Sequence, residues 1–467
     1  MSLVPLGAQL THLLAAGRPP LRLVRADAPA PMAPTPGGGF RRGFAALRHK
    51  NYRTYWIGQL VSLAGTWMQS VSQPWLVLLL GGSPLQLGTV LALQYTPSLF
   101  LAPLGGVLAD RIDKRRTLMV AHTVAIVQAV TLFTLTVTGV VEIWHVMALA
   151  FMLGLVNAVE MPVRQAFSAE LVPRKDLMNA IALNSASFNL ARVAGPALAG
   201  VTLAAFGPAF NFGLNSVTYG AVLVGLWRID PRHLNRVERP DRFASVRASL
   251  VEGLRYTRGT PMVLWPLVLL GGMAVFGMNF QTLLPLFARN TLGFGAEGYG
   301  ALFAAMGVGS LVGSLSLAFI GGRRPLLRLI LGGAVVFVVF EVLLGLSRLP
   351  ALVFPLIMVV GLASMIMVNT INVTVQHHVP DALRGRVMAL YVTVFAGSAP
   401  IGGFFAGAVA QVWGAPAGFL LGAALASVFI LLVGWQLVLR GQAWAAGTAT
   451  ADATLDPKPA PARAANE

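Results

Sequence analysis

The sequence contains no cysteine and few charged residues. Among its 467 residues only 11% are Asp, Glu, Lys or Arg. The lack of cysteine excludes disulfide bonds and thiolate metal sites, and His377 and His378 have no acidic partner at ligand spacing, so we expect no metal site. The low charge leaves too little polar surface for a soluble protein of this length.

Signatures of catalysis are missing as well. The chain has no GxxxxGK[ST] phosphate loop, no HExxH motif and no polar segment large enough to form a nucleotide-binding domain. These absences argue against an enzyme and against transport driven by ATP. We therefore expect no cofactor.

Hydrophobic residues make up 56% of the chain, and the mean hydropathy is +0.72. Apolar runs of about 18 residues or more are typical of membrane-spanning helices, and roughly twelve occur here. We predict an all-α integral membrane protein with twelve transmembrane helices, six in each half. The runs lie near 54–80, 85–109, 117–140, 143–163, 178–205, 208–228, 262–288, 297–321, 325–346, 351–375, 386–411 and 415–440.

An internal repeat relates the two halves. Residues 165–200 return in weakened form at 372–407, so two half-proteins follow one another in the same direction. In an apolar chain this pattern indicates two six-helix bundles that rock around a site between them, which favours a transporter over the alternative of a channel. Aligned pairs 207 residues apart include Val172 and Val379, Pro173 and Pro380, Gly195 and Gly402, and Gly200 and Gly407.

Composition divides the chain into five parts. Residues 1–39 and 442–467 are rich in Ala, Gly and Pro and are predicted to be disordered cytoplasmic tails. Residues 40–228 and 261–441 are the two predicted bundles. Between them, 229–260 is a polar cytoplasmic linker in which apolar residues at helical spacing predict a short amphipathic helix on the membrane surface.

The net charge of +17 is unevenly placed. Basic residues gather in alternate loops, including 41–53, 111–116, 174–175 and 228–258, whereas the intervening loops contain only Arg289 and Arg348. This asymmetry predicts that both termini lie in the cytoplasm. It also favours anionic membrane lipid, and not nucleic acid, as the partner of the basic loops.

The loop after the second predicted span has the sequence GVLADRIDKRR, from Gly106 to Arg116. It resembles the loop signature of the major facilitator superfamily, GxLaDrxGrk, with Asp113 in place of the second glycine. We interpret Gly106, Asp110, Arg111 and Arg115 as a cytoplasmic gate, in which the glycine permits close helix approach and Asp110 meets a basic group or a helix end on closure. The alternative is a plain turn that obeys the charge rule.

Four further segments sharpen this resemblance: GTWMQSVSQPWLVL at 65–78, NAVEMPVRQAF at 157–167, NAIALNSASFNLARVAGP at 179–196 and LRGRVMALY at 383–391. They resemble the branch of that superfamily that contains the enterobactin exporter and macrolide-efflux proteins, over roughly residues 40 to 440. The resemblance implies the major facilitator fold and the export of small organic molecules across the bacterial inner membrane by proton antiport, by a protein acting as a monomer. Both a dedicated siderophore exporter and a broad-specificity drug exporter stay open.

Ionisable residues inside the spans are candidate functional groups, because they are costly in a membrane. Glu160 and Arg164 lie one helical turn apart on the fourth span, and Arg192 lies on the fifth. We hypothesise that Glu160 carries the coupling proton while Arg164 or Arg192 favours its ionised form. The alternative is a structural ion pair at the membrane edge. Glu341, close to the outer end of the ninth span, is predicted to be a solvated interfacial acid, with a proton relay as the alternative.

Polar residues in the middle of apolar spans predict the substrate path. Together with nearby aromatic residues and methionines, they indicate an amphipathic cavity for bulky, partly apolar cargo. The alternative for each of them is a hydrogen bond between helices. The candidates are Gln69, Gln73, Gln94, Tyr95, Asn189, Asn279, Gln281 and Asn369.

Overall fold

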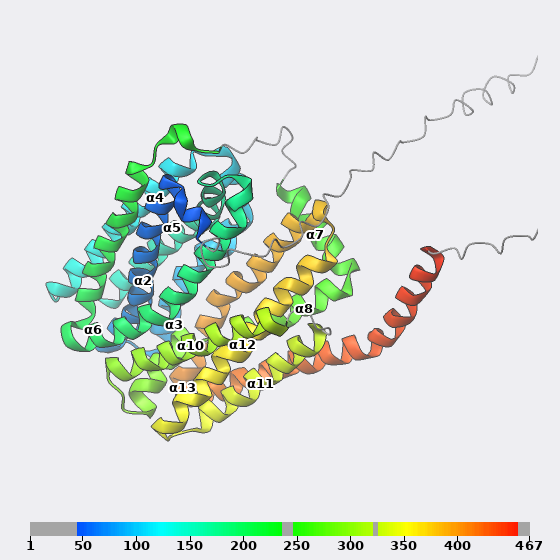
Figure 1. Cartoon of the computed structure of the whole chain (residues 1–467). Coiled ribbons are helices and arrows are strands. Elements are labelled where there is room, and N and C mark those ends of the chain that lie inside the picture. The colour runs from blue at the N-terminus through cyan, green and yellow to red at the C-terminus, as the bar shows by residue number, and fades with distance from the viewer. Residues whose placement is uncertain (1–43, 236–245, 321–325, 456–467) are drawn as a thin grey trace, which may run out of the picture. The chain divides into compact units, whose positions relative to one another are not determined.

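The computed structural model describes the backbone of residues 44–235, 246–320 and 326–455. Within these ranges, the side chains of 102–111, 246–250, 318–320, 381–382 and 437–455 are outside the description. The predicted tail at 1–39 and residues 456–467 lie outside the described residues. All regular elements of the described part are helices (Figure 1).

Five long helices follow one another in the first half of the chain. Short 3-10 turns join some of them, and η1 (Ala45–Arg48) precedes the first. The long helices are α2 (Lys50–Leu79), α3 (Pro84–Arg111), α4 (Lys114–Val137), α5 (Ile143–Glu170) and α6 (Leu177–Arg228).

The second half begins with a short helix in the predicted linker, α7 (Val246–Gly259). The next predicted span is interrupted, because a π-helical turn, η4 (Met273–Gly277), separates its two α-helical parts, and a second one, η5 (Phe287–Thr291), follows the last of them. The α-helices of this half after α7 are α8 (Pro261–Gly272), α9 (Phe280–Leu286), α10 (Ala296–Ile320), α11 (Leu326–Leu346), α12 (Pro350–His378) and α13 (Asp381–Leu455).

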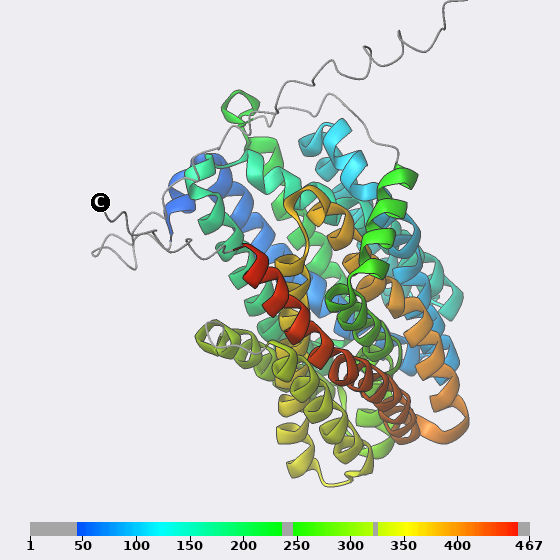
Figure 2. The same ribbon diagram turned by 90° about the vertical axis from the view of Figure 1, so that its right-hand side faces the viewer.

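Two of these helices are longer than one membrane crossing, which needs about 20 residues. α6 has 52 residues and α13 has 75, and each is interrupted by a glycine with positive φ, Gly207 at 76° and Gly414 at 81°. A residue with a side chain is strained in that conformation. The two glycines are 207 residues apart, which is the offset of the sequence repeat. Figure 2 shows the two parts of α13, amber and red, both leading away from their turn at the lower right, so the chain reverses its direction there.

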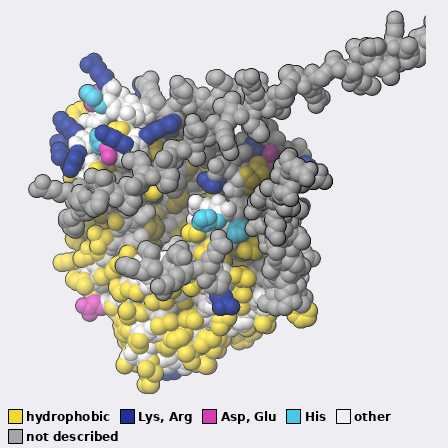
Figure 3. Space-filling view, turned by 45° about the vertical axis from the view of Figure 1, so that its right-hand side comes forward, with side chains coloured by type: hydrophobic (Ala, Val, Ile, Leu, Met, Phe, Trp, Pro, Cys, Tyr) yellow, Lys and Arg dark blue, Asp and Glu magenta, His cyan; other side chains and the backbone are white. Residues whose placement is uncertain are grey.

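Among the described residues, eight helical segments are long and apolar enough to cross a membrane. One segment contains α6 and another, Leu383–Gln436, covers most of α13, whereas α2 and α3 lie in none. Large hydrophobic side chains are exposed on the outside of the helices, for example Phe206 and Leu431. In the space-filling view, hydrophobic surface covers the lower part of the face, and Lys and Arg side chains gather near its upper edge (Figure 3). This distribution is typical of a protein surrounded by lipid.

Helix packing brings distant segments together. α2 packs along α6, and α3 along α5; in the second half, α10 and α11 both pack along α12. Contacts between the halves are made mainly by α3 with α13 and by α6 with α10 (Figure 1).

One boundary differs from the sequence prediction. A disordered tail was predicted from residue 442, but α13 continues as a helix to Leu455. The segment is rich in alanine, which has the highest helix propensity. The prediction gave more weight to low sequence complexity than to this propensity.

Candidate functional site

The helices have two ends that differ in character. We call the end at which α7 lies the linker end. We call the opposite end, where the chain turns at positive-φ glycines, the turn end; these glycines are Gly81, Gly139, Gly207, Gly293 and Gly414.

A cavity of about 510 Å³ lies among α2, α5 and α6, toward the linker end. Its walls combine aromatic rings with polar side chains, and this combination suits a cargo that is partly apolar and partly hydrogen-bonding. Asn189, a predicted cavity residue, lines it. The principal lining side chains are Tyr55, Trp56, Gln59, Arg164, Gln165, Ser168, Asn184, Phe188 and Asn189.

Three polar atoms of the lining residues are buried and lack a partner within the described part of the chain. They are the hydroxyl of Tyr55, the indole Nε1 of Trp56 and Oε1 of Gln59. Buried polar groups are nearly always hydrogen-bonded, because an unmade bond is costly. These three groups, all within two turns of α2, are two donors and one acceptor that lie without a partner in residues lining the cavity.

Glu160 and Arg164 form an ion pair at the edge of this cavity. Nη1 of Arg164 lies 3.5 Å from Oε1 of Glu160, and the two side chains are 21% and 12% exposed. The spacing of four residues on α5 places them on one helix face. Arg164 lines the cavity itself, so cargo in the cavity can reach the guanidinium that holds the carboxylate.

Arg192 does not join this pair. Its Nη1 lies 3.4 Å from the sulfur of Met365 on α12, across the interface of the two halves. Of the basic side chains that the structure describes, only Arg164 lies within 4.0 Å of Glu160. In this conformation Arg192 therefore does not pair directly with Glu160.

Four of the predicted cavity residues meet at the interface of the halves. Nε2 of Gln73 donates to Oε1 of Gln94 at 3.0 Å, and the hydroxyl of the adjacent Tyr95 donates to Oε1 of Gln281 at 3.1 Å. The second bond joins α3 in the first half to α9 in the second. These residues are thus brought together, and here they hydrogen-bond to one another.

The remaining three candidates lie elsewhere, within helix packing. Gln69 is buried and bonds to Gln128 and Asn215. The amide of Asn279 donates to backbone carbonyls of its own segment, including Val275 O at 2.8 Å. Asn369 donates to Ser314 at 3.2 Å. None of the three lines the cavity around Glu160 and Arg164.

In the predicted gate motif, the structure describes neither the surroundings of Gly106 nor the side chains of Asp110 and Arg111. Arg115 donates to the carbonyl oxygens of Leu226, at 2.7 Å, and Trp227, at 3.0 Å, and so binds the last turn of α6. Asp113, which replaces the second glycine of the signature, accepts a hydrogen bond from the backbone of Arg116 and caps α4.

The turn end is closed by backbone contacts between glycines. A Cβ atom on Gly88 of α3 would lie 2.3 Å from the carbonyl oxygen of Gly403 on α13, and one on Gly300 of α10 would lie 2.3 Å from Cα of Gly200 on α6. Neither position has room for a side chain. Gly200, one of the glycines aligned by the repeat, thus meets a glycine of the other half.

Two further contacts seal this end. The ring of Trp75 stacks on that of Tyr299 with centroids 5.5 Å apart, and the guanidinium of Arg289 donates to the carbonyl oxygen of Leu78 at the end of α2. Both contacts join the two halves. Arg289 was noted in the sequence only as an exception to the charge rule.

Comparison with known proteins identifies the family of this chain. Residues 41–459 match the family described as transmembrane secretion effector. The chain belongs to this family of the major facilitator superfamily.

Relatives in this superfamily are membrane transporters. The chain is 26% identical to the staphyloferrin A transporter of Staphylococcus aureus, over 75% of this chain and 87% of that one. It is 28% identical to the multidrug efflux pump Tap of Mycolicibacterium fortuitum, over 77% and 89%, and 25% identical to the enterobactin exporter EntS of Shigella boydii, over 73% and 81%.

Solved structures show the same fold. A variant of the nucleoside transporter NupG superposes with a TM-score of 0.68 at 12% identity, covering 83% of this chain and 98% of that one. A bacterial homologue of the lysosomal transporter Spinster, solved in an inward-facing and unoccupied conformation, gives 0.63 at 13% identity, with coverage of 85% and 96%. The fold is therefore that of major facilitator transporters.

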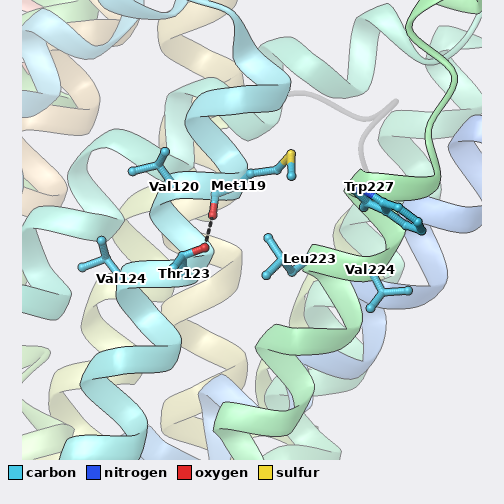
Figure 4. Close-up of a pocket in the computed structure, with 7 residues that line it drawn as sticks. All are labelled: Met119, Val120, Thr123, Val124, Leu223, Val224 and Trp227. Carbon is cyan, nitrogen blue, oxygen red and sulfur yellow. Dashed lines mark hydrogen bonds between the residues drawn. The ribbon is translucent and has the colours of Figure 1, made fainter.

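A second hollow, of about 500 Å³, differs from the polar cavity among α2, α5 and α6 in the polarity of its lining. It lies between α4 and α6, and its lining is almost entirely apolar (Figure 4). The hydroxyl of Thr123, its one hydroxyl-bearing residue, donates to Met119 O. With Val120 and Trp227 largely exposed, this hollow faces outward, where lipid surrounds a membrane protein. Its lining is Met119, Val120, Thr123, Val124, Leu223, Val224 and Trp227.

The burial of one ionisable residue differs from the prediction. Glu341 on α11 was predicted to be solvated at the interface, but its exposure is 0%. The prediction was wrong because depth along a helix says nothing about which neighbours cover the residue. Segments far away in the sequence cover it here.

Proposed function

We propose that this protein is a secondary active transporter that exports small organic molecules across the bacterial inner membrane by proton antiport. The observation that carries the proposal is the cavity among α2, α5 and α6, because it combines unpartnered polar groups, aromatic walls and an ionisable pair at its edge. The names of the relatives, a staphyloferrin A transporter, a multidrug efflux pump and an enterobactin exporter, also support a small organic cargo.

The arrangement of spans supports twelve crossings. Eight segments meet the length and hydropathy requirements, α6 and α13 each add a second crossing at their glycine turns, and α2 and α3 add two more. We place the linker end in the cytoplasm, because the basic loops gather there. Both termini are then cytoplasmic, in a monomer of two six-helix bundles.

The difference between the two ends of the helices supports a mechanism of alternating access. The turn end is sealed by glycine contacts and by the Trp75–Tyr299 stack, while the polar cavity lies toward the linker end. We assign this conformation as the one that loads cargo from the cytoplasm. Rocking of the bundles would separate Gly88 from Gly403 and Gly200 from Gly300 and release the cargo outside.

Glu160 is the proton carrier in this proposal. Its carboxylate is held by Arg164, which also faces the cargo cavity. Cargo and proton alternate at this pair: after the cargo has left on the outside, the carboxylate takes up a proton from outside, and it releases that proton to the cytoplasm when the next cargo binds beside Arg164. The competing interpretation is an ion pair that only stabilises α5.

A broad-specificity drug exporter is the second candidate. The ion pair leaves the cavity with little net charge, and Tyr55, Trp56 and Phe188 give it aromatic walls. Both features favour apolar or cationic drugs over a strongly anionic siderophore.

Reconstitution in liposomes with a pH-sensitive dye inside tests both candidates. Under an imposed proton gradient, we would add macrolides, cationic dyes and iron-free catecholate siderophores in turn. The proposal predicts a proton leak that depends on one cargo class and is lost in Glu160→Gln but kept in Glu142→Gln, an exposed acid at the turn end. Cargo-dependent proton movement that survives in Glu160→Gln would contradict the role of Glu160.

A further inference from the structure

Glu341 is sealed inside the second half of the molecule. It lies on α11, five residues before the end of the helix at Leu346, and its exposure is 0%. Both carboxyl oxygens lack a hydrogen-bond partner within the described part of the chain. A carboxylate in such a place has lost its hydration without gaining a donor, which makes the charged form very costly.

Two glycines form the walls of this niche. A Cβ atom on Gly277 of η4 would lie 3.3 Å from Oε2 of Glu341, and one on Gly422 of α13 would lie 3.9 Å from Oε1. The ring of Phe337 lies beside Gly277, 2.9 Å from the position that a Cβ atom on Gly277 would take. The carboxyl group therefore fits between two backbones that carry no side chain at these points.

No charged or titratable group that the structure describes faces the niche. The elements packed against Glu341 are η4, α12 and α13. The charged residues of α11 to α13 whose side chains are described lie at the linker ends, and Arg348, beyond the turn end of α11, donates to Gly345 O and Ser347 O. Those at the linker ends are Arg328, His377, His378, Arg384 and Arg386.

The niche adjoins a break in the membrane span. η4 ends at Gly277, and Met278 and Asn279 both have non-helical backbone angles before α9 begins at Phe280. π-helical turns of this kind are rare and occur often at functional sites. Gln281, four residues after Gly277, accepts the bond from Tyr95 that joins the halves. A single short segment thus connects the carboxyl niche to the interface of the halves.

We propose that Glu341 is a proton-binding site of the second half, occupied in this conformation and linked through η4 and α9 to closure of the turn end. The neutral carboxylic acid fits the dry niche. When the turn end opens and water reaches the niche, the carboxyl group exchanges its proton with water outside, and the carboxylate must take up a proton from outside again before it can return to the dry niche. The consequence for transport rests on the proposed antiport, whereas proton binding itself does not.

Infrared spectroscopy of the purified full chain in lipid tests the proton without any transport. The C=O stretch of a protonated, buried carboxylic acid is distinct from the bands of carboxylates. We expect this band at neutral pH in the wild type and in Glu297→Gln, an exposed acid on α10, and its loss in Glu341→Gln. Persistence of the whole band in Glu341→Gln, or its absence from the wild type, would overturn the proposal. Should Glu341→Gln not fold, a shift of the band in Glu341→Asp gives the same assignment.

The link to the turn end is tested by distance measurements between two spin labels. Because the chain has no cysteine, Val140→Cys and Leu349→Cys, both exposed near the turn end and in different halves, can be labelled without other changes. In the otherwise wild-type protein, raising the pH until the band disappears should lengthen the distance. In Glu341→Gln the distance should stay short at every pH. An equal lengthening in both proteins would refute the link, even if antiport itself were established.

Discussion

The two halves share a backbone plan but treat their buried acids in opposite ways. In the first half, Glu160 is paired with Arg164 at the edge of a polar cavity. In the second, Glu341 is unpaired and fully enclosed between two glycines, within the described part of the chain. The duplication preserved the glycine turns at 207 and 414, which fix the path of the chain, but neither acid has an acidic counterpart at the repeat offset.

Under the two proposals, one fold carries two proton sites of different kinds. A paired carboxylate stays charged and responds to anything that competes for its partner. An enclosed carboxyl group stays neutral and responds to hydration of its niche. The first is suited to sense cargo and the second to sense conformation. The comparison predicts that equivalent mutations in the two halves have different effects.

The largest expected effect comes from breaking the pair in the first half. Arg164→Leu leaves a mostly buried carboxylate without its partner, and we expect a loss of about 3 kcal/mol in the free energy of unfolding. Glu160→Gln in the same chain should restore most of that loss. Thermal unfolding in detergent measures both, with Arg255→Leu, an exposed arginine on α7, as the matched control. If the double variant were as unstable as Arg164→Leu alone, the pair would not be the cause.

Glycine contacts between the halves give the next effect. Gly88→Ala or Gly300→Ala places a methyl group against backbone atoms of the other half. Overpacking of this kind costs about 1–3 kcal/mol, which shifts the equilibrium away from the closed turn end by roughly 5- to 150-fold. The spin-label pair at Val140 and Leu349 reports the shift. Gly220→Ala, where the added methyl group would meet nothing within 4 Å, should leave the distances unchanged.

A smaller effect is expected at the bond between the halves. Tyr95→Phe removes the donor to Gln281, and a typical hydrogen bond contributes about 1 kcal/mol, or roughly a fivefold change in the conformational equilibrium. The effect of the double variant Tyr95→Phe with Gln281→Leu should be smaller than the sum of the effects of the single ones, and a cycle of the four proteins measures the coupling. Zero coupling would mean that the bond does not hold the halves together.

The smallest effect on stability is expected at Glu341. Gln has the size of Glu and, like a neutral carboxylic acid, both donates and accepts, so we expect Glu341→Gln to change the free energy of unfolding by less than about 1 kcal/mol. The measurement is the same thermal unfolding. A loss as large as that of Arg164→Leu would indicate that Glu341 is charged and paired, and the contrast between the halves would disappear.

Much of this fold could be predicted from the sequence. Hydropathy located the helices, and the repeat offset that relates Gly195 to Gly402 also relates the turns at Gly207 and Gly414. The pairing of Glu160 with Arg164 followed from their spacing on one helix. These features are local or periodic, and for that reason a single chain reveals them.

The rest depends on contacts between distant segments. Arg192 and Arg164 are both basic residues within the spans, but Arg192 faces α12 instead of α5. Asn279 has a polar side chain, as a cavity residue would. Its amide, however, donates to the backbone carbonyl of Val275, next to the break in its own helix. Glu341 is enclosed by residues 64 positions before it and 81 positions after it, at Gly277 and Gly422. No spacing along the sequence encodes such partners.

Proton release on cargo binding tests the central claim most directly. For the cargo identified in liposomes, calorimetric titration of the detergent-solubilised protein in buffers of different ionisation enthalpy counts the protons exchanged, without a membrane or a gradient. The account predicts that cargo binding exchanges protons in the wild type and in Glu297→Gln, and that this exchange is absent in Glu160→Gln. Cargo binding without proton exchange in the wild type, or with unchanged exchange in Glu160→Gln, would contradict antiport through this pair.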